Sequence, residues 1–164
     1  MESTENSSQH SQYLLAIDAG VKTGLALYGR PDKLIWYRSH NMGSVSSLRK
    51  AAAHLLHSIE GLKVIVIEGG GPVAEAWKKE AIRPGLEVIS TDAGVWRKEL
   101  LFPREYRDSV TAKHAAIGLA KQIIDKSDAP SANFPTHDAA EAILIGLWGC
   151  KKYGWIQELP FIKR

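Results

Sequence analysis

The sequence predicts an α/β fold in which one five-stranded mixed sheet is covered by helices on both faces. Two observations lead to this prediction. Three strand-like segments joined by short turns come first, and short apolar runs then alternate with segments of helical periodicity. A meander followed by alternating strands and helices combines antiparallel and parallel pairs, and such a sheet buries both faces under helices.

The five strands are predicted from apolar runs and from the turns between them. The turns "DAGVK" and "GRPD" are short enough to join the first three strands as antiparallel hairpins. "KVIVIE" is a continuous apolar run, which is typical of a strand covered on both faces. The predicted strands are 13–17, 23–28, 33–39, 63–68 and 86–90.

Helices are predicted after the third strand and after each later one. Ser44 and Thr136 are suited to cap the first and the last of them, and apolar residues follow at helical spacing. The last helix is apolar nearly all round, so we expect it to be buried. The predicted helices run from Ser44 to about Glu60, from Pro72 to about Arg83, briefly after Asp92, from 109 to 126 and from 136 to 152.

Length and composition indicate one globular domain. The chain has 164 residues, of which 45% are hydrophobic, and a net charge of +3 that permits an anionic partner. Its one cysteine, Cys150, excludes an intrachain disulfide and favours a reducing, cytoplasmic compartment. No apolar run is long enough to cross a membrane, and the polar start lacks the features of a secretory signal. We expect a disordered tail over 1–12 and a single domain over 13–164.

Two acidic residues end predicted strands, Asp18 after "LLAI" and Glu68 after "VIVI". A buried carboxylate is costly unless a cation, hydrogen bonds or water compensates it. The alternatives are structural, because Asp18 can cap a turn and Glu68 can be an exposed charge at a strand end. The glycines at 69–71 match neither nucleotide-binding fingerprint, yet they allow a close approach of the backbone.

The last helix carries a pair of acids. Glu141 is the only charged residue between positions 139 and 149, and Asp138 lies three residues before it. At that spacing the two Cβ atoms are about 5–6 Å apart. Two like charges on a buried helix repel, and a divalent cation is the simplest compensation. Asp138 alone has another explanation, since an acid in a first turn interacts well with the helix dipole.

The segments "AIDAGVKTGLALYG", "VIVIEG" and "HDAAEAILIG" resemble, in this order, the motifs of the RuvC-type Holliday-junction resolvases of the ribonuclease H-like nuclease superfamily. The resemblance covers about residues 13–150 and implies a ribonuclease H-like fold. Position 141 is a glutamate, whereas aspartate is usual in the family. In this respect the sequence resembles the phage and plastid-type branch more closely. The chain departs from the family at "GGGP", where aromatic or apolar residues often probe the junction centre. The resemblance implies that the catalytic metal ligands are Asp18, Glu68, Asp138 and Glu141.

The implied activity is resolution of four-way DNA junctions by paired, metal-dependent nicks. Carboxylate ligands suit two Mg²⁺ ions, for which Mn²⁺ substitutes. Two such ions about 3.5–4 Å apart activate the attacking water and stabilise the departing 3′-oxygen. Asp18 is expected to bridge them, with Glu68 on one and the helical pair on the other. His137 either assists a proton transfer, contacts a phosphate or faces solvent.

The implied partners are a four-way DNA junction and a second copy of the chain. A junction has two-fold related strands to cut, so we expect a homodimer, formed through the helix 73–83 that carries Trp77 as an interface or core residue. The expected setting is the cytoplasm, either at the nucleoid or, for a phage-encoded protein, in the host. Cations interleaved with aromatic residues can contact phosphates and stack on bases of DNA. The alternative for each cation is an ordinary solvated charge. The predicted DNA-binding residues are Lys22, Lys78, Lys79, Trp96, Arg97, Lys98, Arg104, Arg107 and Lys113.

Three other functions remain open from the sequence. The same acids would serve a nuclease of this fold that acts on RNA/DNA hybrid or on precursor ribosomal RNA. "DAGVKTG" also resembles the phosphate loop of actin-like kinases and ATPases, which need a second nucleotide-binding half that 164 residues cannot hold. A non-catalytic junction-binding or scaffold protein is expected to have lost acids of the set, and all four are present.

Overall fold

The structure is a computed structural model that describes residues 11–131 and 135–160. Within this part of the chain, five strands form one sheet in the order β3-β2-β1-β4-β5. β2 is antiparallel to β1 and β3, whereas β4 is parallel to both β1 and β5. The strands are β1 Tyr13–Asp18, β2 Lys22–Gly29, β3 Lys33–Asn41, β4 Leu62–Glu68 and β5 Glu87–Thr91.

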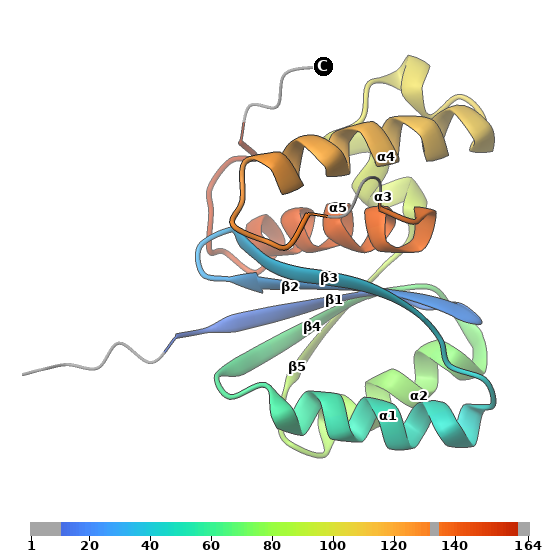
Figure 1. Cartoon of the computed structure of the whole chain (residues 1–164), viewed down its shortest axis with the longest axis vertical. Coiled ribbons are helices and arrows are strands. Elements are labelled where there is room, and N and C mark those ends of the chain that lie inside the picture. Colours follow the sequence, from blue (N-terminus) through green and yellow to red (C-terminus); the bar gives the residue numbers. More distant parts are fainter. Residues whose placement is uncertain (1–10, 132–134, 161–164) are drawn as a thin grey trace, which may run out of the picture.

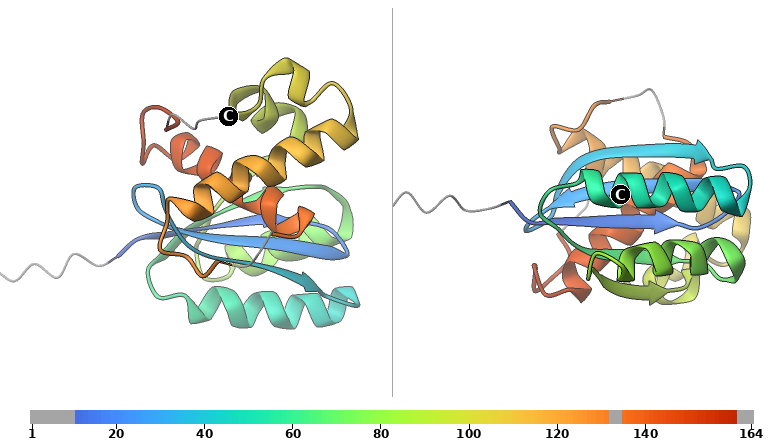
Figure 2. Two further views of the ribbon diagram at one scale, coloured as in Figure 1. Left: turned by 45° about the horizontal axis from the view of Figure 1, so that its top comes forward. Right: turned by 90° about the horizontal axis from the view of Figure 1, so that it is seen from below.

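Helices cover both faces of this sheet (Figure 1). α1 and α2 lie side by side on one face, as the right-hand view of Figure 2 shows, and α5 lies on the other face beneath α4. Within the described residues, no helix is long and apolar enough to span a membrane. The helices are α1 Val45–Ser58, α2 Gly71–Ile82, α3 Ala93–Leu100, the 3₁₀ turn η1 Pro103–Glu105, α4 Ser109–Asp125 and α5 His137–Lys152.

These elements confirm the predicted α/β fold, in which helices cover both faces of a five-stranded mixed sheet. Every predicted strand and helix is present, with ends shifted by at most two residues, and Ser44 and Thr136 cap α1 and α5 as expected. The turn η1 was not predicted, because it spans only three residues. Of the predicted tail, residues 1–10 lie outside the described part of the chain.

The two faces of the sheet bury separate halves of the core. Alternate residues of β1 face opposite sides: Leu14 and Ala16 pack under α3, α4 and α5, whereas Leu15 and Ile17 pack against α1 and α2. α5 is buried along its whole middle, from Ala139 to Cys150. The hydroxyl of Tyr28 in β2 donates a 2.6 Å hydrogen bond to the carbonyl of Ile143, which holds α5 against the sheet.

Candidate active site

The two strand-end acids are neighbours. β1 and β4 are parallel, and the register places Asp18 directly beside Glu68. The strand alternation that puts Leu14 and Ala16 under α5 directs both carboxylates to that same face. The turns beyond the strands also touch, because the Ala19 amide donates to the Glu68 carbonyl at 2.9 Å. Gly69 has a positive φ of 121°, and a Cβ there would lie 2.9 Å from the Ala19 carbonyl oxygen.

Gly24 brings the acids of α5 to this edge. It lies in β2 directly opposite Asp18, beneath the first turn of α5. A Cβ at Gly24 would collide with the backbone carbonyl of Asp138, so only glycine permits this approach. The sequence analysis did not single out Gly24, although a glycine inside a strand is the signal that indicates a close backbone approach.

The four acids form one electrostatic group. Burial, followed by the charges of Glu68, Glu141 and Asp138, raises the pKa of Asp18 to about 8. Burial and the Glu141 charge also raise the pKa of Glu68. Carboxylates that raise the pKa of a neighbour in this way are stabilised in their charged form by a cation among them. The structure therefore gathers the acids of β1, β4 and α5 at one edge of the sheet.

Glu141 already has cationic and polar partners. Its side chain is 3% exposed, and its Oε1 accepts from Arg97 Nη2 at 2.8 Å and lies 3.0 Å from His137 Nε2. A divalent cation was expected as the simplest compensation for Glu141, and the structure shows that Arg97 of α3 also supplies a compensating positive charge. Arg97 was expected to contact DNA, and the structure places it against this carboxylate. No local pattern reveals the pair, since the two residues are 44 positions apart.

Trp96, beside Arg97 in α3, is also part of the site. Its side chain is fully buried, and its Nε1 donates to Glu68 Oε2 at 3.3 Å. Our assignment of Trp96 as a DNA-binding residue is therefore wrong for this conformation, because a buried ring has no face on which a base can stack. Consecutive residues of α3 thus hold two of the four acids.

The donor set fits a divalent cation in its chemistry. Carboxylate oxygens are the ligands that Mg²⁺ prefers. The other three acids are all close enough to Asp18 for their charges to raise its pKa. In the described residues, however, no group of three or more His, Cys, Asp or Glu side chains is close enough to enclose an ion. The carboxylates must therefore move closer together before they can enclose a metal ion. Glu141 must in addition exchange its present partner Arg97.

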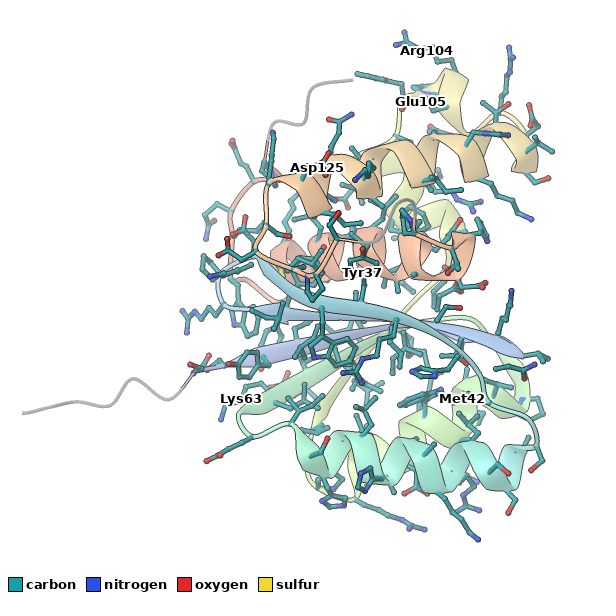
Figure 3. All side chains as sticks on the ribbon, viewed as in Figure 1. Tyr37, Met42, Lys63, Arg104, Glu105 and Asp125 are labelled. Carbon is teal, nitrogen blue, oxygen red and sulfur yellow. The ribbon has the colours of Figure 1, made fainter. Side chains whose placement is uncertain are left out.

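The other predicted DNA-binding residues lie at the surface. Lys98 lies in α3, Arg104 in η1, Arg107 in the turn that follows η1, and Lys113 in the second turn of α4. Arg104 stands at the outer end of this connection (Figure 3). The guanidinium carbon of Arg104 lies 4.9 Å from the ring centre of Phe102. Phe102 is an exposed aromatic residue that was not predicted as part of the DNA-binding set. The other lysines of the predicted DNA-binding set, Lys22, Lys78 and Lys79, are also exposed or partly exposed. Lys78 pairs with Glu75 at 3.4 Å.

Trp77 does not serve an interface. It is fully buried in the core between α2 and the sheet. Of the two alternatives for Trp77, an interface residue or a core residue, the structure therefore supports the core residue. The exposed apolar residue of α2 is Ile82, at 65% exposure.

Comparisons with known proteins find similarity to this chain in structure but not in sequence. No protein-family description matches the chain, and no curated protein sequence does so either. Among solved structures, the yeast mitochondrial Holliday junction resolvase Ydc2 is similar, with a TM-score of 0.46 and 15% identity over 81% of this chain and 76% of that one.

The raised pKa of Asp18 predicts a loss of stability with rising pH in the metal-free protein. An acid whose pKa rises from 3.8 in the unfolded chain to about 8 in the folded one stabilises the fold at low pH. This contribution is lost between those two values, at no more than about 1.4 kcal/mol per pH unit. Urea unfolding in a chelator at several pH values measures the slope. In Asp18→Asn the slope should be shallower, and an identical slope in both proteins would contradict the prediction.

Proposed function

We propose that this protein is a magnesium-dependent endonuclease that resolves four-way DNA junctions by paired nicks. One observation carries the proposal: four carboxylates from β1, β4 and α5 converge at one edge of the sheet, where three of them raise the pKa of the fourth. A cluster of acids that repel one another in this way is unfavourable without a function or a cation. The sequence resemblance assigns the same four residues as ligands.

Asp18, Glu68, Asp138 and Glu141 would hold the ions. When bound, two divalent ions at such a site supply an activated water and stabilise the departing 3′-oxygen. The chain's own residues orient the acids: the Trp96 indole donates to Glu68, and Arg97 and His137 contact Glu141. His137 Nδ1 also lies 3.9 Å from Asp138 Oδ1, so this ring contacts both acids of α5.

DNA would reach this edge along the exposed cations that follow α3 in the chain. Exposed Lys98, Arg104, Arg107 and Lys113 continue from α3, whose Trp96 and Arg97 contact the acids. Such cations neutralise phosphates and supply affinity without reading sequence. We therefore assign binding of the junction arms to the segment from α3 to the start of α4.

A homodimer would supply one active site for each of the two strands that a junction presents. The ends of α1 and α2 expose apolar side chains at Val45 and Ile82, at 42% and 65% exposure. These residues replace Trp77 as the candidate apolar contacts of the interface.

Cleavage of labelled substrates tests this function. The protein is incubated with a four-way junction, an RNA/DNA hybrid and a plain duplex in Mg²⁺, and its mass is measured by sedimentation with and without junction. We expect paired nicks in opposing strands of the junction and a dimer. Cleavage of the hybrid in preference to the junction would instead support a ribonuclease. A shifted but uncut junction would support a non-catalytic binding protein, and a monomer in both conditions would exclude the dimer.

A further inference from the structure

Arg97 reaches from α3 to the acid of α5 that is most deeply buried. Its Nη2 donates to Glu141 Oε1 at 2.8 Å, and the two side chains are 22% and 3% exposed. The guanidinium also lies 5.2 Å from the ring centre of Trp96, which is itself buried and bonded to Glu68. The arginine is thus held within the acidic cluster rather than at the surface.

The charge of Arg97 acts on more than Glu141. It lowers the pKa of both Asp18 and Glu68, against the effects of burial and of the other carboxylates. A single guanidinium therefore partly neutralises three of the four acids. This is the charge compensation that a divalent ion at the same acids would otherwise provide.

The guanidinium is not fully satisfied where it lies. Its Nε is buried and, within the described residues, has no hydrogen-bond partner. An unpartnered buried donor is unfavourable and calls for an explanation. The ion pair with Glu141 therefore leaves part of the arginine's bonding capacity unused, which lowers the free energy needed to break the pair.

We propose that Arg97 is a built-in counter-ion for Glu141 that a divalent metal ion displaces. In the metal-free protein Arg97 positions Glu141 and offsets the repulsion among the acids. A divalent ion held by Glu141 would compete with the guanidinium for this carboxylate, because two cations at one carboxylate repel each other. This inference rests on the proposed metal-dependent function, and it makes Arg97 a positioning residue that competes with the metal.

Direct metal binding tests the exchange. Mg²⁺ and Mn²⁺ are titrated by calorimetry into the wild type, Arg97→Gln and Arg97→Lys, and each protein is melted with and without metal. Arg97→Gln keeps a side-chain donor but removes the charge, so metal should bind about five- to tenfold tighter, as is typical of coupled sites. The metal-free melting temperature should fall and the rise on adding metal should grow. Arg97→Lys keeps the charge and should bind metal nearly as the wild type does.

Arg49→Ala is the matched control. Arg49 also pairs with a buried glutamate, since its Nε lies 3.4 Å from Glu80 Oε1, but this pair joins α1 to α2 on the opposite face of the sheet. Arg49→Ala should lower the melting temperature without changing metal affinity. If Arg97 had only a structural role, Arg97→Gln would likewise lower the melting temperature and leave the metal affinity unchanged.

The outcomes separate this inference from the proposed function. A wild type that binds metal and cuts junctions, together with an Arg97→Gln variant that binds metal no tighter, would overturn the exchange alone. A wild type that binds no divalent ion and cuts no substrate would overturn both. Tighter metal binding in Arg97→Gln but not in Arg49→Ala supports the exchange.

Discussion

Asp18→Asn is expected to abolish cleavage while it spares binding of the junction. Asp18 is the acid on which the other three act, so its loss removes the centre of the proposed metal site. We expect the cleavage rate to fall about a thousandfold or more, since bound metal supplies several kcal/mol of transition-state stabilisation. Single-turnover cleavage in Mg²⁺ measures the rate, and a gel shift in Ca²⁺ measures binding, which depends on cations elsewhere.

The control for this variant is Asp125→Asn. Asp125 lies at the end of α4, where it pairs with Lys121 at 3.0 Å and is 58% exposed. Its loss should change neither cleavage nor binding. If Asp18→Asn cut the junction at nearly the wild-type rate, the carboxylates of this edge would not be the active site.

Gly24→Ala is expected to be strongly destabilising and to separate the acids of α5 from those of the sheet. The added methyl group would meet the Asp138 carbonyl, a backbone atom that cannot rotate away, so the first turn of α5 must move. We expect a loss of roughly 1–3 kcal/mol or more in the free energy of unfolding, as for other overpacked sites. Metal affinity should fall as well, because Asp138 would move away from Asp18. Urea unfolding and calorimetry measure the two effects.

Gly118→Ala is the matched control, since it makes the same substitution in α4 where the space around the new Cβ is open. Alanine is favoured over glycine inside a helix by about 0.8–1.0 kcal/mol, so this variant should be more stable than the wild type. A Gly24→Ala protein with normal stability and metal affinity would show that α5 does not depend on this contact.

The sequence was sufficient to predict the elements of the fold because the signals that define them are local. Apolar runs, hairpin turns and caps such as Ser44 and Thr136 act over a few neighbouring residues. The order of those elements then limits the topology. A strand that follows a helix, as β4 follows α1, can pair in parallel with an earlier strand, because the helix serves as the crossover that parallel pairing requires. The sequence placed Asp18 and Glu68 at the ends of their strands, and the parallel pairing of β1 with β4 in the structure then brings both acids to one edge of the sheet.

The sequence was not sufficient to predict how the site is compensated. The short helix after Asp92 was predicted to carry residues that bind DNA, yet Trp96 is in the core and Arg97 contacts Glu141. Helical periodicity states which residues share a face, but it does not state what lies opposite that face. The sequence left Trp77 open between core and interface for this reason, because a large ring among charges suits either, and the structure places it in the core.

By itself, then, the sequence determined the α/β fold, its elements and the four acids that we propose as metal ligands. Only the tertiary structure decided which charges face those acids and how closely α5 approaches the sheet. The contacts responsible join Arg97 to Glu141, Trp96 to Glu68 and Gly24 to Asp138, and each links elements far apart in the chain. Such contacts depend on the packing of whole helices against the sheet, and packing leaves no periodic signal in the sequence.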